Sequence, residues 1–304
     1  MWKTSDELFL ILDDRGGGLH QAFKRKVKFN LRQMWFKKEL NQLRTYLEKN
    51  HLDDLLQIDP ALYLKCTRSY LRADLNGSER SKAQLAFYNW FLSIASAEQI
   101  CEFYKAKQST IAQISIKDKI FEIQLKPAGG LGREGELAAF FYLDGELLIK
   151  AAFTILPASL LGLPGSGNFM YIGGFQGARN ALDRFKEATQ ILERVKPAHV
   201  FFNTLQTMAQ SWHLEGILAT ADSTHAYASY KTTLAKRVKT SYDHTWSELG
   251  ATSQTSKGIW SLPLVWEPRP ESEIESKKRA AYRRRNTLRQ NFMEACRSGA
   301  AKLF

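Results

Sequence analysis

Cysteine is scarce in this sequence, because 304 residues contain only Cys66, Cys101 and Cys296, far apart along the chain. Neither a disulfide framework nor a metal site with paired cysteines fits this spacing, so we expect three buried, reduced thiols. The six histidines are scattered and no HExxH motif occurs, so the sequence predicts no metal site. A P-loop lysine motif and a Gly-x-Ser-x-Gly elbow are missing too, which argues against those two enzyme classes.

Long hydrophobic runs are also missing. No apolar stretch reaches the roughly 18 to 20 residues that span a bilayer. The short run from Leu8 to Leu12 follows acidic residues and ends in Asp13-Asp14, unlike a signal peptide. We therefore expect a cytoplasmic protein, and peripheral attachment to the inner membrane surface stays open.

Basic residues, by contrast, are in excess. The chain has 43 Lys and Arg against 31 Asp and Glu, a formal charge of +12, with an ordinary 44% of hydrophobic residues. This balance favours an anionic partner such as a phospholipid head group, lipopolysaccharide, a phosphorylated cofactor or nucleic acid, without choosing among them. Since no nucleic-acid-reading module is recognisable, we expect nucleic acid only as a tRNA-linked donor.

Hydrophobic periodicity divides the chain near residue 110. Residues 1–110 read as helical, including an amphipathic stretch over 62–75, whereas alternating β-branched residues begin at Ile111. Asp144-Gly145 predicts a type I′ hairpin. Over 169–222 we expect strand, helix, strand, helix, strand, with a short strand at 199–202. The prediction is an α+β protein with a helical region (1–110), a mixed sheet domain (111–304) and a basic C-terminal helix from Ser276.

Several ordered motifs resemble the VirK/YbjX family of bacterial proteins. They are Arg133-Glu134-Gly135-Glu136-Leu137, the Tyr171 to Gly177 block, Lys196-Pro197, the Ser223 to Tyr227 element, the Tyr242 to Gly250 element and the basic segment from Ser276 to Arg285. The resemblance covers about residues 65–293, although Phe87-Tyr88 stands where the family tends to carry His followed by an aromatic residue. It implies a role in the bacterial envelope, virulence and resistance to cationic antimicrobial peptides, and no settled reaction.

Glycines precede the clearest helix of the chain. Gly173, Gly174 and Gly177, with Gln176, predict a loop whose backbone N–H groups approach a phosphate, and Arg179 adds charge. The pattern resembles the acyl-coenzyme-A site of GNAT acyltransferases, so an acyl donor linked to coenzyme A, a carrier protein or tRNA is the candidate cofactor. A tight turn without any ligand is the other interpretation.

The segment after the strand at 217–220 is the candidate catalytic loop. His225 can act as a general base and Tyr227 can protonate a leaving thiolate, with Asp222 and Ser223 beside them. A structural, hydrogen-bonded histidine is the alternative.

Acidic residues open a candidate strand earlier in the chain, near residue 134. Glu134 and Glu136 fall on one face beside Arg133, where they either create a base, with Glu136 assisting His225, or form ion pairs with basic residues of the C-terminal helix. Asp243 is either a ligand for substrate or the cap of a short helix whose Trp246 and Leu249 pack inward.

Two basic stretches remain. The C-terminal helix carries Lys278, Arg279, Tyr282 and Arg283, which form either an anion clamp or a solvated, partly paired surface. Residues 24–49 interleave basic residues with Phe23, Phe29, Trp35 and Phe36, for which core packing is preferred over a membrane-surface helix or a partner groove.

Taken together, these features lead us to expect an acyl- or aminoacyl-transferase-like enzyme that modifies an amine or hydroxyl of a peptide, an envelope component or a small metabolite. The alternative is a non-catalytic accessory protein that binds anionic lipid or a client protein. An enzyme should gather the glycines, His225 and Glu136 around one pocket, whereas an accessory protein should scatter them and expose a basic, aromatic surface.

Overall fold

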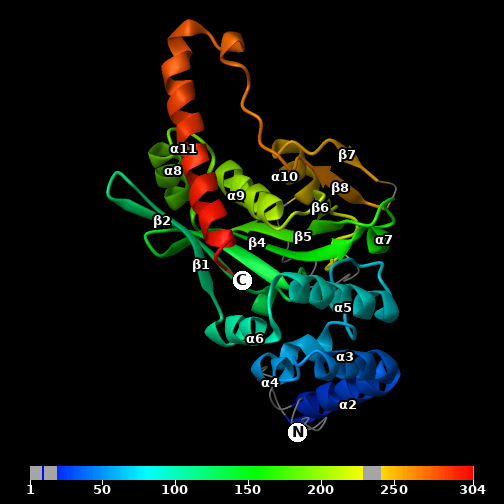
Figure 1. The fold of residues 1–304 in the computed structure, drawn as a ribbon. Helices are drawn as coiled ribbons and strands as arrows, with labels where there is room; N and C mark the ends of the chain where they lie inside the picture. Colours follow the sequence, from blue (N-terminus) through cyan, green and yellow to red (C-terminus); the bar gives the residue numbers. More distant parts are fainter. Residues whose placement is uncertain (1–8, 10–18, 229–240, 256, 304) are drawn as a thin grey trace.

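A mixed eight-stranded sheet forms the centre of the protein (Figure 1). The computed structural model describes residues 9, 19–228, 241–255 and 257–303. The strand order is β1-β2-β3-β4-β5-β6-β8-β7, so the expected α+β class is confirmed. The strands are β1 Ser109–Ile116, β2 Lys119–Pro127, β3 Leu137–Leu143, β4 Glu146–Pro157, β5 Asn168–Gly177, β6 Gly216–Thr220, β7 Ser253–Gln254 and β8 Ile259–Leu262.

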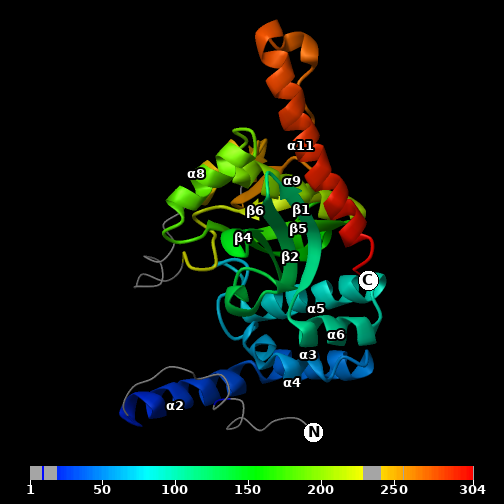
Figure 2. The same cartoon turned by 90° about the vertical axis from the view of Figure 1, so that its left-hand side faces the viewer.

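The first five strands form an antiparallel meander. Its β3–β4 hairpin turns at Asp144 (φ 49°) and Gly145 (φ 77°), and these two positive φ angles are what a type I′ turn requires, as the sequence predicted. The central strand β4 is buried almost continuously because helices cover both faces of the sheet (Figures 1 and 2). The meander therefore gives the site a rigid base.

β5 and β6 are the one parallel pair among the described strands. They pair from Phe169↔Gly216 to Ile172↔Ala219, after which β6 ends at Thr220 while β5 continues to Gly177. The last part of β5 thus has no β6 residue beside it. Polar side chains from other segments lie at this point, as described below.

Helices cover the sheet from both sides. α9 and α11 lie over one face and α5 over the other, with α6, α4, α3 and α2 continuing outward below α5 (Figures 1 and 2). The α-helices are α2 Leu19–Trp35, α3 Lys37–Lys49, α4 Leu55–Ile58, α5 Gly77–Ile94, α6 Ala97–Ala106, α7 Ala158–Leu161, α8 Leu182–Ile191, α9 Pro197–Ser211, α10 Tyr242–Glu248 and α11 Ser276–Ala300. The 3₁₀ helices are η1 Pro60–Leu64, η2 Gly129–Leu131 and η4 Glu271–Glu273.

Local sequence explains the start of α5. The Asn76 side chain accepts a hydrogen bond from the Glu79 N–H, and the Glu79 side chain accepts one from the Asn76 N–H, a reciprocal capping box. Side chains of α5, including Phe87 and Phe91, then join the same hydrophobic cluster as the sheet. The division into 1–110 and 111–304 stays a prediction, since both parts contribute to this cluster.

Two expected elements are wrong. Residues 199–202 belong to α9 and not to a strand, because α9 is buried on nearly all sides and its apolar run is as typical of a strand as of a helix. The stretch 62–75 is helical only as far as η1, and its later part is extended. The apolar run at 8–12 lies outside the described residues apart from Phe9, which packs on Phe29.

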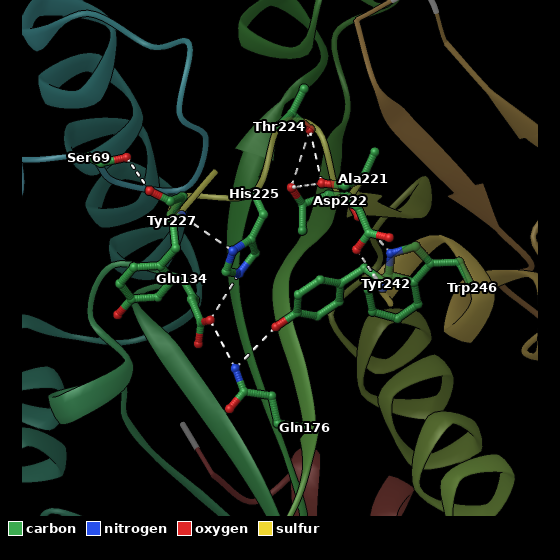
Figure 3. Close-up of polar contacts among 12 residues, drawn as sticks. Ser69, Glu134, Gln176, Ala221, Asp222, Thr224, His225, Tyr227, Tyr242 and Trp246 are labelled. Carbon is green, nitrogen blue, oxygen red and sulfur yellow. Dashed lines mark hydrogen bonds and ion pairs between the residues drawn. The ribbon is translucent and has the colours of Figure 1, made fainter. Parts of the chain in front are cut away.

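The extended residues 69–73 form a strap across the sheet domain. The Leu71 N–H donates to the Arg133 carbonyl (2.7 Å) and the Ala73 N–H to the Thr224 carbonyl (2.9 Å). The Ser69 hydroxyl donates to the Ala226 carbonyl (2.5 Å; Figure 3). Backbone hydrogen bonds and a buried hydroxyl therefore join the helical region to the two segments that carry the candidate site residues.

The three thiols are free and buried, as expected. Burial is the largest cause that raises the pKa of Cys66 and of Cys296, each to about 12. These two cysteines are therefore protonated, unreactive thiols at neutral pH.

Candidate functional site: two buried carboxylates beside a basic cleft

Gly173 and Gly174 lie inside β5 and are buried, so the predicted phosphate-binding loop is wrong. The β4–β5 register skips Gly173 between the pairs Ala152↔Gly174 and Phe153↔Ile172, which marks a bulge. A Cβ atom on Gly173 would lie 2.0 Å from the Glu134 carbonyl oxygen. These glycines are needed because the segment before β3 crosses β5 at backbone contact distance, not because a phosphate approaches them.

The rest of the predicted donor loop is dispersed. Gly177 is the exposed end of β5, and Arg179 is exposed in the connection to α8, which begins only at Leu182. Gln176, near the end of β5, instead points toward Glu134 and Tyr242 and donates hydrogen bonds to Glu134 Oε1 and to the Tyr242 hydroxyl, each 3.1 Å (Figure 3). The glycine block thus contributes one polar side chain to the site.

His225 and Glu134 form a buried pair in the space beside the end of β5. His225 Nε2 lies 3.0 Å from Glu134 Oε1, and the two side chains are 3% and 2% exposed. The Tyr227 N–H donates to His225 Nδ1 (3.3 Å), so Nδ1 is an acceptor and Nε2 carries the proton donated to Glu134. With both ring nitrogens engaged inside the protein, His225 has no nitrogen directed at a substrate.

Two tyrosines enclose the His225 ring. Tyr242 stacks on it (4.7 Å between centroids, 22° between planes), and Tyr227 is tilted against its other side at 5.4 Å. Burial and the neighbouring Glu134 carboxylate raise the pKa of Tyr242, so its hydroxyl stays protonated. Of the predicted catalytic residues, His225 and Tyr227 therefore lie together, but the carboxylate beside them is Glu134 and not the expected Glu136.

Glu136 lies in a different cluster. Lys65 Nζ donates to its Oε2 and the Tyr70 hydroxyl donates to its Oε1, each at a distance of 2.5 Å. Glu136 is 1% exposed. Burial, the largest cause, raises the pKa of the Glu136 carboxyl, although Lys65 and Tyr70 act to lower it. Glu136 thus forms an ion pair, but its partner is Lys65 of the N-terminal region and not a residue of the C-terminal helix, as had been expected. The bonds that the structure gives Glu136 include none to His225.

A basic cleft of about 420 Å³ lies against both clusters. Lys65 and Tyr70, the partners of Glu136, line it, and so do Tyr227 and Arg133, the neighbours of His225 and Glu134. The Arg133 guanidinium lies over the Tyr227 ring, 5.7 Å from its centroid. The full lining is Asp59, Ala61, Leu64, Lys65, Arg68, Ser69, Tyr70, Gly129, Gly130, Gly132, Arg133 and Tyr227.

The charge and the backbone of this cleft suit an anion. Lys65, Arg68 and Arg133 face a single lining carboxylate, Asp59, across it. At Gly129 and Gly130 an added Cβ would meet nothing within 4 Å, so the backbone of this loop is open to a ligand. A glycine-rich loop with cations is thus present at residues 129–133 and not at 173–177.

Asp222 and Asp243 have structural partners. Asp222 accepts a hydrogen bond from the Tyr242 N–H (2.7 Å; Figure 3) and another from the Ser241 hydroxyl (2.8 Å), and these two bonds anchor the start of α10. Asp243 accepts from Trp260 Nε1 (2.7 Å) and the Asp222 N–H (3.2 Å). The helix cap is Ser241, so the capping role expected of Asp243 is wrong.

Ser223 is exposed, whereas the inward packing of α10 follows the prediction. Trp246 is 0% and Leu249 is 7% exposed. Trp246 also donates from Nε1 to the Thr220 carbonyl, 2.6 Å away (Figure 3). This bond ties α10 to the end of β6, directly before the segment that carries His225.

The predicted anion clamp on α11 is a set of local contacts. Arg283 forms an ion pair with Glu271, Lys278 pairs with Glu275 (3.0 Å), and the Tyr282 hydroxyl donates to the Arg269 carbonyl (2.6 Å). Arg279 likewise donates to the Ile274 carbonyl (2.9 Å). This half of α11 projects away from the sheet (Figure 1), and none of the four residues lines the basic cleft.

Sequence reasoning missed three residues of the two buried clusters. Lys65 and Tyr70 fell in a stretch interpreted as an ordinary amphipathic helix, and Tyr242 was noted only as part of a motif. Nothing local marks Lys65, because its carboxylate partner is 71 residues away. The segment from Ser69 to Arg72 mixes polar residues with residues that favour strands, and this was the one available signal that the stretch is not helical.

Two kinds of feature are absent from the described part of the chain. No helix there is long and apolar enough to cross a membrane. Nor do its His, Cys, Asp and Glu side chains form a group of three or more suited to a metal ion.

Comparison with known proteins places the chain in a family. The model of a protein family of unknown function, DUF535, matches residues 19–298. The uncharacterized protein YbjX of Escherichia coli (strain K12) is 26% identical over 241 residues, 77% of this chain and 71% of that protein. An uncharacterized protein of Haemophilus influenzae is 29% identical over 144 residues, 47% of this chain and 45% of that protein.

No solved structure matches. Because the family model covers nearly the whole described chain and agrees with the YbjX match, the resemblance drawn from the motifs is confirmed, and this chain belongs to the DUF535 family that includes YbjX.

Proposed function

We propose that this chain is an acyl- or aminoacyl-transferase-like enzyme whose reaction takes place in the basic cleft. The observation that carries the proposal is the short hydrogen bond from Tyr70 to the buried Glu136 at the cleft wall, with Tyr227 and Arg133 also lining the cleft. The acceptor is an amine or hydroxyl of a peptide, an envelope component or a small metabolite. The donor carries negative charge, which Lys65, Arg68 and Arg133 attract.

Tyr70 and Glu136 supply the base. The acceptor amine attacks the acyl carbonyl carbon, its proton passes to the Tyr70 oxygen, and the Tyr70 proton passes to Glu136 in the same step. Burial favours this transfer because it raises the pKa of the Glu136 carboxyl and so stabilises its protonated form. The bond from the acyl carbon to the donor sulfur or oxygen then breaks, and the leaving group takes a proton from Tyr227. Water then returns a proton to Tyr227 and accepts the one held by Glu136, which restores the starting state.

His225 acts as a positioning residue in this scheme. Its ring separates Tyr227 from Tyr242, and Glu134 fixes its orientation through Nε2. The strap forms a bridge from Arg72 to the His225 backbone, so the same residue also ties the cleft wall to the sheet. A GNAT-like core is part of the proposal, supported by the parallel pair β5–β6 that ends next to this cluster.

A ligand that stays bound to the protein through purification tests the proposed donor site. Native mass spectrometry of the protein purified from bacterial cells should detect a bound acyl donor. Arg133→Gln should lose the adduct, whereas the matched control Arg179→Gln should keep it, because Arg179 lies outside the cleft. Equal retention in both variants, or loss only in Arg179→Gln, would contradict the cleft as the donor site.

Turnover of that donor tests the chemistry. With hydroxylamine as the acceptor, hydroxamate formation should fall about 10²- to 10⁴-fold in Tyr227→Phe and in Tyr70→Phe, the range for loss of a proton-transfer group. Tyr142→Phe is the control, since Tyr142 lies on β3 and does not line the cleft. Unchanged rates in both test variants would exclude the proposed roles.

A second candidate is favoured by one specific observation. The glycines, His225 and Glu136 are not gathered around one pocket, and this is the arrangement expected of a non-catalytic accessory protein that binds anionic lipid or a client. Under that proposal the cleft holds a ligand without converting it, so ligand retention would persist while hydroxamate formation would not occur.

A further inference from the structure

One face of α2 exposes large apolar side chains in a continuous row. The exposed fractions are 66% for Phe23, 41% for Val27, 41% for Leu31, 71% for Met34 and 73% for Trp35. The intervals of four and three residues place all five on one side of the helix. Because core packing was the preferred interpretation of Phe23 and Trp35, the structure corrects it for these two residues. Phe29 and Phe36 do pack against the protein interior.

This row is not covered by any other described element. A hollow of about 400 Å³ along it is lined by α2 residues alone, among them Lys24 and Lys28. The helix lies at the outer edge of the helical layers, at the end of the molecule opposite the free half of α11 (Figures 1 and 2). An exposed apolar row of this length is a binding surface, since single exposed apolar residues are ordinary but contiguous ones are not.

The charge of α2 identifies its partner. The helix contains five Lys and Arg residues and no Asp or Glu. Lys24 and Lys28 are exposed and precede Trp35 by eleven and seven residues, which puts them on the same face of the helix. Exposed Lys37 and Lys38 follow in α3. Apolar side chains flanked by lysine, with Phe and Trp toward the two ends, are typical of helices that lie in the interface of an anionic bilayer.

We propose that the α2 face, formed by Phe23, Val27, Leu31, Met34 and Trp35, docks the protein on a negatively charged membrane surface. The apolar row enters the boundary between head groups and acyl chains while Lys24 and Lys28 contact anionic head groups. The proposal is independent of the chemistry in the basic cleft, which α2 does not line.

Vesicle co-sedimentation of the full chain tests this surface. Vesicles that contain phosphatidylglycerol should bind the protein, those of phosphatidylcholine alone should bind it at least tenfold less, and raising the salt from about 0.05 M to about 0.5 M should weaken binding. Phe23→Ser combined with Trp35→Ser should reduce binding at least tenfold. The matched control is Leu182→Ser, since Leu182 is 69% exposed on α8.

Three outcomes would overturn the proposal. The first is no binding of the wild-type chain to phosphatidylglycerol vesicles. The second is an equal effect of the control and the double variant. The third is a self-associated wild type that the double variant converts to monomers in the absence of lipid, because a second copy would then occupy the face. Circular dichroism and thermal unfolding should be unchanged in the double variant, since both side chains are exposed.

Discussion

The ion pair beneath the basic cleft and the ion pair that joins the outer half of α11 to η4 have opposite surroundings. Lys65 and Glu136 are 7% and 0% exposed at the side chain, whereas Arg283 and Glu271 are 66% and 42% exposed. Water screens the second pair and solvates either partner when the other is removed, but it does neither for the first. A similar ion pair is thus a fixed part of the interior at one place and a weak surface contact at the other.

Removing one partner of the buried pair should have the largest effect. Lys65→Met leaves the Glu136 carboxylate without its cation, and we expect the free energy of unfolding to fall by about 3 to 5 kcal/mol. Urea denaturation followed by circular dichroism measures this loss. Lys65→Met combined with Glu136→Leu should recover much of it, because no uncompensated charge remains. A loss below about 1 kcal/mol in the single variant would show that water reaches the pair.

His199 should give an effect between these extremes. Burial, followed by Arg289 and Lys196, holds its pKa below the usual value, so the unfolded chain takes up a proton at a higher pH than the folded chain does. The free energy of unfolding should therefore decrease as the pH falls from about 7 to about 5. His199→Gln should flatten this slope in denaturation series at several pH values. An unchanged slope would assign the pH dependence to other groups.

The exposed pair should give the smallest effect. Arg283→Ala removes the ion pair with Glu271, and we expect the smallest loss of stability of the three variants because both side chains face solvent. The same urea series as for Lys65→Met gives the comparison. A loss as large as that of the lysine variant would mean that burial does not distinguish the two regions.

Local signals in the sequence predicted most strands and many helices. The β3–β4 hairpin followed from Asp144-Gly145, and α11 begins at Ser276, as expected. Where the fold prediction failed, an apolar run in α9 fitted two kinds of element equally well. The burial of this segment by the rest of the fold decided between the two, and that burial cannot be read from the sequence.

The candidate site was predictable only in part. His225, Tyr227 and Glu134 were named and lie together, because one motif and one strand opening carry them. The position of the glycine-rich anion site was misjudged, since a glycine needed for close backbone contact looks the same in sequence as one in a phosphate loop. Lys65 could not be found, because its role depends on a contact across the fold.

The strap has a consequence for how this family can change. Because residues 69–73 bond to the backbone at Arg133, Thr224 and Ala226, the walls of the cleft come from three distant stretches that must be inherited together. A shortened relative that retained only the sheet would lose Lys65 and Tyr70 along with the strap. Such a chain would keep an imidazole and a carboxylate but have no enclosed chamber in which to use them.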